Sequence, residues 1–153
     1  MGAEPEEDHI QVGQAAPDDW PWMLQGYERT AWHSLLPSRR RWTSRRDVRV
    51  QVTAQVAAFR AREGNGFAAL LARDGFGRRA GFVWVDESRH GFTGEARAYV
   101  IQLYVSRAYR RRGVGRTLMA AAEEWARARP AASCPQRGRP QSGGTLPLRA
   151  PRL

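Results

Sequence analysis

Apolar and polar residues along the first half of the chain predict one strand followed by two helices. Residues 9–15 (HIQVGQA) alternate weakly between polar and apolar side chains, which favours a strand. Between Pro17 and Pro37 apolar side chains return every three to five residues, which predicts a helix that ends before the second proline. A second helix is predicted from about Asp47 to Glu63, where the sequence Gly-Asn-Gly stops the pattern.

The pattern then changes to that of strands. Residues 67–73 and 80–85 are apolar runs joined by a short glycine-bearing loop, so they predict a β-hairpin. A polar loop over 86–97 leads into 98–105 (AYVIQLYV), which is apolar on both faces, as in a central strand covered by helices. A last helix is predicted over 113–129. This order of elements predicts an α/β fold of the α+β type with a mixed sheet.

Several side chains allow a structural and a functional interpretation. The first predicted helix carries apolar residues that fit a hydrophobic core, while some of them also fit the floor of a substrate pocket: Trp22, Met23, Tyr27, Trp32 and Leu35. The basic loop 38–46 (SRRRWTSRR) is interpreted as a solvated connection. His90 has neither a second imidazole nor a placed carboxylate beside it in the sequence, so we expect a solvated histidine rather than a ligand or a base.

Composition narrows the function classes. The net charge is +10, but all 25 basic residues are arginines, a bias more typical of a GC-rich gene than of an evolved phosphate-binding surface. Cys134 is the one cysteine, which excludes an internal disulfide framework and a structural zinc site, and we expect no metal. No apolar run reaches the ~18 residues of a membrane span, and the N-terminus is acidic where a secretory signal is basic. We therefore expect a cytoplasmic protein without a membrane partner.

The two ends of the chain differ from its middle. Residues 1–8 are rich in acidic side chains and predict a disordered leader. Residues 130–153 are rich in proline, arginine and glycine and hold no acidic or aromatic residue, so they predict a disordered tail. The predicted organisation is one folded domain over 9–129 between these segments.

The stretch YRRRGVGRTL (residues 109–118) carries the candidate chemistry. A glycine-rich turn that opens a helix offers main-chain N–H groups and the positive end of the helix dipole, and these bind phosphate. Gly113 and Gly115 let an anion approach without a Cβ in the way. The Walker loop requires a lysine, which the chain lacks, and the dinucleotide fingerprint requires a third glycine where Leu118 stands. These two phosphate-binding motifs are therefore excluded.

Together with its surroundings, this stretch resembles the acetyl-CoA motif of the GCN5-related N-acetyltransferase (GNAT) family. That motif is a strand ending in L-x-V, followed by [Q/R]-x-x-G-x-[G/A] at the start of a long helix. Here Leu103-Tyr104-Val105 precedes Arg110-Arg111-Arg112-Gly113-Val114-Gly115. The resemblance covers residues 9–129. Over 98–129 it rests on the residues of the motif, and before residue 98 it rests only on the order of helices and strands. It implies a GNAT-like acyl-CoA N-acyltransferase fold that is truncated after the motif helix, because the later strands and helix of the family are not visible in the sequence that follows.

The resemblance implies acetyl-CoA as the co-substrate and a primary amine, on a small molecule or a peptide, as the acceptor. Main-chain amides of residues 111–116 would hold the CoA pyrophosphate, and the main chain at Leu103 and Val105 would pair with the pantetheine arm. The amine would attack the thioester directly, without a covalent enzyme intermediate. The residues assigned to cofactor binding are Leu103, Tyr104, Val105, Arg110, Arg111, Arg112, Gly113, Val114, Gly115 and Arg116.

No catalytic residue is assigned. Some family members carry a glutamate, as a candidate base, on the strand that precedes the motif. Tyr99 stands at the matching position here, and Glu95 lies four residues earlier. The general-acid tyrosine that follows the motif helix in the family is not visible in the tail, so we expect the chain as written to turn over barely at all. A reading-frame shift in GC-rich DNA would produce such a tail, and a short homologue is the alternative.

A second function class stays open at this point. A basic nucleic-acid-binding module would use the arginines of residues 39–46 and 107–116, although the arginine bias makes nucleic acid the less favoured partner. Saturable binding of acetyl-CoA would separate the two classes. A homodimer is also left open.

Overall fold

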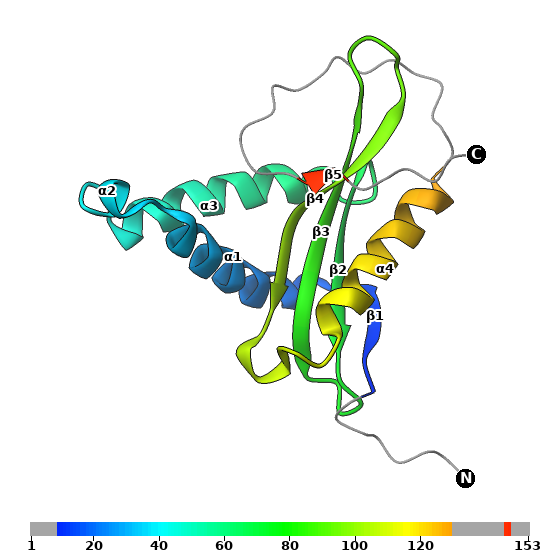
Figure 1. Cartoon of the computed structure of the whole chain (residues 1–153), viewed down its shortest axis with the longest axis horizontal. Helices are drawn as coiled ribbons and strands as arrows, with labels where there is room; N and C mark the ends of the chain where they lie inside the picture. Colours follow the sequence, from blue (N-terminus) through cyan, green and yellow to red (C-terminus); the bar gives the residue numbers. More distant parts are fainter. Residues whose placement is uncertain (1–8, 130–145, 148–153) are drawn as a thin grey trace.

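The computed structural model describes residues 9–129 and 146–147, and Figure 1 shows their arrangement. The predicted leader 1–8 and most of the predicted tail 130–153 lie outside the described residues. In chain order the elements are β1 (Gln11–Gln14), the 3-10 helix η1 (Pro17–Asp19), α1 (Trp20–Ser34), α2 (Pro37–Arg40), α3 (Arg45–Arg60), β2 (Phe67–Arg73), β3 (Arg79–Arg89), β4 (Ala96–Val105), the 3-10 helix η2 (Arg107–Tyr109), α4 (Val114–Ala128) and β5 (Leu146–Pro147).

The strands form one sheet in the order β1-β2-β3-β4-β5, and every strand pair among the described residues is antiparallel. One row of paired residues crosses the four longer strands: Val12 faces Ala72, Ala72 faces Gly81, and Gly81 faces Val105. The two-residue strand β5 falls within the predicted tail and pairs with residues 99–100 of β4. The strands and helices predicted from the sequence occur in the predicted order, with boundaries shifted by a few residues. Helix α2 in the predicted connection and β5 in the predicted tail were not predicted.

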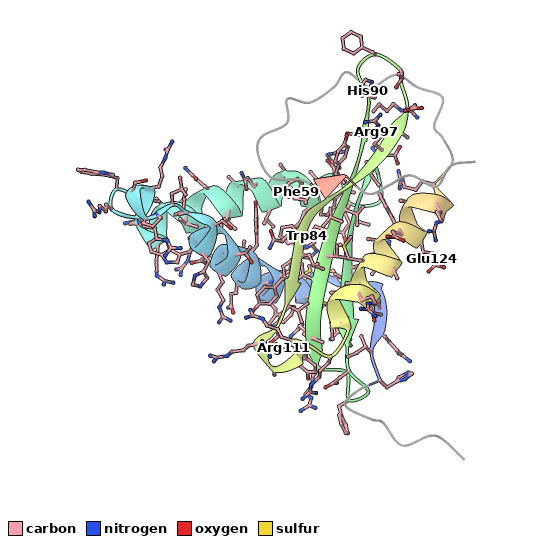
Figure 2. The ribbon with its side chains drawn as sticks, viewed as in Figure 1. Phe59, Trp84, His90, Arg97, Arg111 and Glu124 are labelled. Atoms are coloured by element: carbon pink, nitrogen blue, oxygen red, sulfur yellow. The ribbon has the colours of Figure 1, made fainter. Side chains whose placement is uncertain are left out.

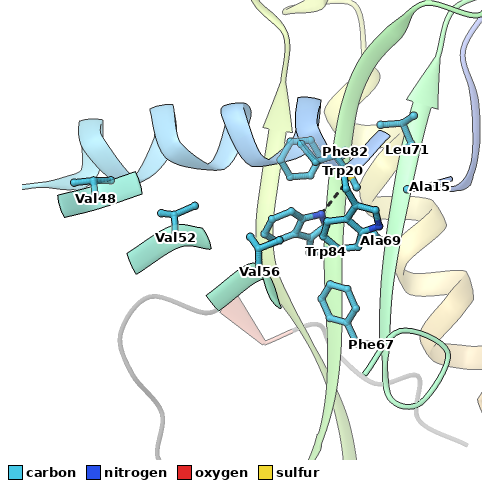
Figure 3. Packing of buried hydrophobic residues seen from close by; sticks show 11 residues of the cluster. Ala15, Trp20, Val48, Val52, Val56, Phe67, Ala69, Leu71, Phe82 and Trp84 are labelled. Atoms are coloured by element: carbon cyan, nitrogen blue, oxygen red, sulfur yellow. Dashed lines mark hydrogen bonds between the residues drawn. The ribbon is translucent and has the colours of Figure 1, made fainter. Parts of the chain in front are cut away.

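Helices cover both faces of the sheet (Figure 1). Helices α1 and α3 pack on one face around an aromatic core that includes Trp20, Met23, Phe67, Phe82 and Trp84 (Figure 3). Helix α4 packs on the other face around an aliphatic core, which includes Ala72, Val83, Val85, Val114, Leu118 and Ala122. Alternation of side chains along β3 supplies both cores, because successive residues of a strand point to opposite faces.

The apolar residues of α1 belong to the aromatic core or pack against it. Met23 is fully buried and its sulfur accepts a hydrogen bond from Trp84 Nε1 at 3.4 Å. The other four residues for which two interpretations were open are partly buried against the same core: Trp22, Tyr27, Trp32 and Leu35. Helix α1 approaches the sheet closely at Gly26, where a Cβ would lie 2.8 Å from the Phe82 ring. The core interpretation of these residues is therefore confirmed.

A buried carboxylate fixes the start of α1 to the sheet. Asp19 accepts hydrogen bonds from Arg73 Nη2 at 2.6 Å and from Arg79 Nε at 2.8 Å, and its other oxygen accepts from the Ala16 amide. Burial by itself raises the pKa of Asp19, but the bonds from Arg79, Ala16 and Arg73 lower it below its usual value. Asp19 therefore stays ionised and joins η1 to both β2 and β3.

Two sequence predictions about β4 and its neighbourhood were wrong. The strands buried on both faces are β2, over residues 67–72, and β3, over residues 80–85, whereas most of β4 is only half-buried. The polar loop predicted over 86–97 is also shorter, because β3 continues to Arg89 and β4 begins at Ala96. Hydrogen bonds between the main chains hold the two strands together there, although their side chains are polar.

Candidate functional site

The loop between η2 and α4 holds its main chain in the left-handed region at two positions. Gly113 has φ +79° and caps the helix, and Arg111 has φ +64°, which is uncommon for a residue with a side chain. The amide of Thr117 donates to the Gly113 carbonyl at 3.0 Å, which is the first hydrogen bond of the helix. The amides of residues 114–116 come before that bond, so they point out of the helix N-terminus. The start of α4 therefore leaves these main-chain amides without a partner inside the helix, as the sequence predicted for a helix opened by a glycine-rich turn.

Past its pairing with β5, β4 has no further strand partner among the described residues, and its edge at Leu103 and Val105 lies next to this loop. The amide of Ser106 donates to Ala80 O of β3 at 2.8 Å. Because residues of an antiparallel strand alternate between the two sides, Leu103 and Val105 direct their main-chain N–H and C=O groups away from β3. A Cβ on Gly115 would lie 3.7 Å from Val105 Cγ2. The structure thus brings together the two halves of the predicted site, the L-x-V strand and the glycine loop.

The side chains of the motif point in different directions. Tyr104 lies on the α1 face, where its ring packs beside Trp22 and Phe82, and its hydroxyl accepts a 3.5 Å hydrogen bond from Arg29. Leu103, 38% exposed, and Val105 lie on the α4 face. The side chains of Arg110, Arg111 and Arg116 are exposed, and the Arg112 guanidinium lies 5.7 Å from the centre of the Tyr109 ring.

Arg110 has a specific main-chain contact that the sequence did not reveal. Its Nε donates to the Val105 carbonyl at 3.1 Å, and this is a carbonyl that the L-x-V resemblance assigns to pairing with pantetheine. An arginine has five N–H donors, so both terminal nitrogens of Arg110 remain able to meet a phosphate. Arg110 therefore links the end of β4 to the loop.

A β-bulge interrupts the pairing of β4 with β3 in the middle of the strand. Trp84 faces Gln102, and the next residue of β3, Val85, faces Val100, so Ile101 is the extra residue. Bulges bend a strand and re-aim its groups, and they are common beside active sites. The Gln102 side chain is buried at this point. Nothing in the apolar run AYVIQLYV indicated the bulge, because a bulge depends on the register with the partner strand.

A buried hydrogen-bond network anchors the loop from below. Tyr109 Oη donates to Asp74 Oδ2 at 2.7 Å, and Asp74 also accepts from the amides of Phe76 and Arg78 and from Arg78 Nε. Burial by itself raises the pKa of Asp74, but the hydrogen bonds from Tyr109, Arg78 and Phe76 lower it to about 2. The turn between β2 and β3 is thereby tied to η2, one residue before the three arginines. Sequence reasoning missed this pair, because residues 74 and 109 are brought together only by the fold.

Acid is expected to weaken this anchor. The pKa of Asp74 is about 2 in the folded chain against a usual 3.8, so its ionised form stabilises the fold above pH 3.8 and the contribution is lost as the pH falls towards 2. Asp74→Asn should be less stable than the parent chain at pH 6, and the two free energies of unfolding should converge by about pH 2. Urea unfolding at a series of pH values measures this, with the exposed Asp18→Asn as control. Parallel curves at all pH values would contradict it.

The two residues considered for general base differ in their distance from the loop. Glu95 lies in the turn between β3 and β4, eight residues before Leu103, and at about 3.3 Å per residue this places it ~26 Å away along the strand. Figure 2 shows the two ends of the sheet, with Arg111 at one and His90 at the other. Glu95 is therefore out of reach of a group bound at Leu103. Tyr99 is closer and lies opposite Asp86 in the pairing of β4 with β3.

The described residues contain no group of three or more His, Cys, Asp or Glu side chains that could hold a metal ion. Within the same part of the chain, no helix is both long and apolar enough to cross a membrane. His90 sits in the turn between β3 and β4, where its Nδ1 accepts hydrogen bonds from the amides of Phe92 and Thr93. Its contacts there are those of a turn residue.

The fold is that of known acetyltransferases. A protein from Pyrococcus furiosus described as an acetyl transferase matches with a TM-score of 0.64 and 14% identity, over 76% of this chain and 74% of that one. A GCN5-related N-acetyltransferase from Ralstonia eutropha JMP134 matches with a TM-score of 0.57 and 17% identity, over 76% and 74%. An aminoglycoside 6'-N-acetyltransferase from Acinetobacter haemolyticus matches with a TM-score of 0.54 and 18% identity, over 75% and 70%. At these identities the likeness establishes the fold alone.

The sequence itself gives the family. The model of the acetyltransferase (GNAT) family matches residues 21–137, which is more than half of the chain. The chain belongs to the GNAT acetyltransferase family. No curated protein sequence is significantly similar to it.

Proposed function

We propose that the chain binds acetyl-CoA at the N-terminus of α4 and along the edge of β4, and transfers the acetyl group to a primary amine. The observation that carries this proposal is the adjacency of Gly115 and Val105, with 3.7 Å between a Cβ on the glycine and Val105 Cγ2. A single extended ligand could contact both elements there. Membership of an acetyltransferase family supports acyl transfer as the reaction class.

The helix end is the part of the site suited to the pyrophosphate. Amides that precede the first helical hydrogen bond can each donate to a charged oxygen, and such bonds contribute about 1.5–3 kcal/mol. The exposed guanidinium groups of Arg110, Arg111 and Arg116 add positive charge around them. The pantetheine arm would then lie along β4 as an added strand and pair with the main chain of Leu103 and Val105.

Transfer itself requires a neutral amine. At pH 7 an amine with a pKa near 10.4 is neutral in only about one molecule in 10³ to 10⁴, a cost of roughly 4–5 kcal/mol that a base or a desolvating pocket must offset. The nitrogen lone pair attacks the thioester carbon, the C–S bond breaks, the nitrogen loses a proton, and the CoA thiolate gains one. The main-chain N–H of Leu103 would polarise the carbonyl oxygen at the open edge of β4.

Calorimetry with acetyl-CoA tests the binding half of this proposal, and release of free thiol with a panel of primary amines tests the transfer half. Saturable 1:1 binding and amine-dependent thiol release are the expected results. Binding without amine-dependent thiol release would leave the chain a CoA-binding protein and overturn the transfer. No binding of acetyl-CoA, with salt-dependent binding of nucleic acid instead, would favour the basic nucleic-acid-binding module. The slow turnover expected from the sequence stays a prediction, and the same thiol assay measures it.

Arg110→Ala is expected to change the ligand preference of the site. The substitution removes the guanidinium from the phosphates but frees the Val105 carbonyl from its 3.1 Å hydrogen bond. A net hydrogen bond contributes about 0.5–1.5 kcal/mol, so pantetheine, which lacks the pyrophosphate, should bind about two- to tenfold more tightly than to the parent chain, while CoA binds more weakly. Arg111→Ala keeps the Val105 contact and is the matched control. Weaker binding of both ligands to Arg110→Ala would contradict this expectation.

A further inference from the structure

The helices α1 and α3 extend past the edge of the sheet at β4, and α2 lies at their far end (Figure 1). We call residues 36–47, which include α2 and the two connections beside it, the basic tip. The tip holds five arginines and one aspartate, a net charge of +4. Its geometry is that of a protrusion from the domain.

Two of the arginines in the tip have structural contacts. Arg40 caps the end of α1, where it donates to Leu35 O at 3.0 Å and to His33 O at 2.8 Å. Arg45 lies over the Trp32 ring at 4.7 Å. The single acid, Asp47, is occupied by the cap of α3, where its carboxylate accepts from the Ser44 amide at 2.9 Å and from Ser44 Oγ at 2.7 Å.

Other charges of the tip face solvent. Arg39 and Arg41 are exposed and form no ion pair with any residue of the described ranges 9–129 and 146–147. Arg46 is exposed beside Asp47 and lowers the pKa of that carboxyl, after the larger effect of the hydrogen bonds from Ser44. The tip therefore presents positive charge that the protein itself does not neutralise.

Large apolar side chains stand among these arginines. Trp42 is 90% exposed and Leu36 is 67% exposed. A single exposed apolar residue is ordinary. A highly exposed tryptophan and a leucine within one arginine-rich protrusion, however, form a combined apolar and cationic surface. Neither side chain packs in the cores described above, so the fold does not account for them.

We propose that the basic tip docks on an anionic lipid surface. Tryptophan is suited to the boundary between headgroups and acyl chains, and the apolar Leu36 would enter the same layer. Arginines attract acidic headgroups electrostatically. The guanidinium can stay at the level of the lipid phosphates while the aliphatic part of the side chain lies deeper in the bilayer. A protruding tip can meet a planar surface without rearrangement of the sheet.

A single-stranded nucleic acid is the rival occupant and fits less well. Such strands bind in grooves that combine basic residues with several aromatic platforms. The tip protrudes, its one highly exposed ring is Trp42, and Leu36 cannot stack on a base. The sequence-based expectation of no membrane partner concerned a spanning segment and a secretory signal, so it did not address peripheral contact through a folded tip.

Co-sedimentation with vesicles tests this proposal on the full chain. We expect binding to vesicles of phosphatidylcholine with phosphatidylglycerol and little binding to phosphatidylcholine alone. Arg39→Glu/Arg41→Glu should lower the partition coefficient at least about tenfold, because two attractive charges become repulsive. Arg41→Glu alone should lower it less than the double variant does, and Arg127→Glu, on an exposed arginine of α4, is the single-charge control for Arg41→Glu and should change partition much less. Trp42→Ala should lower partition several-fold without changing the preference for anionic lipid.

The outcomes separate the alternatives. Equal partition on neutral and anionic vesicles, or tip variants that bind like the parent chain, would overturn the proposal. Binding of single-stranded RNA through Arg39 and Arg41 with no vesicle binding would also overturn it and assign the tip to nucleic acid. All substituted side chains are exposed, and circular dichroism checks that each variant is folded. Trp42→Ala keeps the charge unchanged, so it tests the apolar part of the proposal should the double charge reversal fail to fold.

Discussion

Replacing Gly115 by valine is expected to abolish acetyl-CoA binding and to leave the fold in place. A Cβ at this position would lie 3.7 Å from Val105 Cγ2, which is an ordinary contact, so the ligand-free chain has room for that atom. The two γ-methyl groups would, however, crowd the amides at the start of α4, where we place the pyrophosphate. Several hydrogen bonds from main-chain amides, of about 1.5–3 kcal/mol each, would be lost together, so affinity should fall by at least about a hundredfold.

Two further variants separate the causes of that loss. Gly113→Val has open space around it but sits at φ +79°, so a side chain strains the backbone by roughly 1–2 kcal/mol and should lower both stability and binding. Arg111→Ala removes one exposed guanidinium among several and should only weaken binding. Calorimetry with acetyl-CoA and urea unfolding measure the two effects. Equal losses of affinity in Gly115→Val and Arg111→Ala would point to recognition by side chains instead of the main chain.

Replacing Gly81 by alanine is expected to push β4 away from β3 at the candidate site. A Cβ at Gly81 would lie 2.6 Å from the main-chain oxygen of Tyr104 and 3.1 Å from Leu118 Cδ1. A backbone atom cannot yield as a flexible side chain can, so the strands must separate where Gly81 faces Val105. We expect a loss of about 3 kcal/mol in the free energy of unfolding, the upper end for overpacking, together with loss of acetyl-CoA binding.

Gly13→Ala is the matched control for that experiment. Gly13 also lies in a strand, its φ is outside the left-handed region, and a Cβ there would meet nothing within 4 Å. Its stability should change by less than about 0.5 kcal/mol, as for other surface substitutions. Unfolding of Gly81→Ala and Gly13→Ala at the same urea concentration would contradict the close approach of β3 and β4 at Gly81.

Local sequence patterns were enough to predict the order of elements, the helix-opening glycine loop and the family. These depend on interactions between residues that are near one another in the chain: the repeat of apolar residues in α1 and α4, and the glycine at the start of α4 that permits φ +79° at Gly113. Such patterns are visible in a linear sequence because each is complete within a few residues. The L-x-V strand and the glycine loop could therefore be predicted with their residue numbers.

The tertiary structure alone decided how the site is supported and how exposed its strand is. The Asp74–Tyr109 bond joins residues 35 positions apart, the bulge at Ile101 depends on the register of β4 against β3, and the contact of Arg110 with Val105 O depends on the loop conformation. The apolar run of β4 is compatible with a covered central strand, and only the placement of α1, α4 and β5 around the sheet leaves it half-buried. Long-range pairing sets these features because burial and register are properties of two segments together, and a local pattern reports on only one of them.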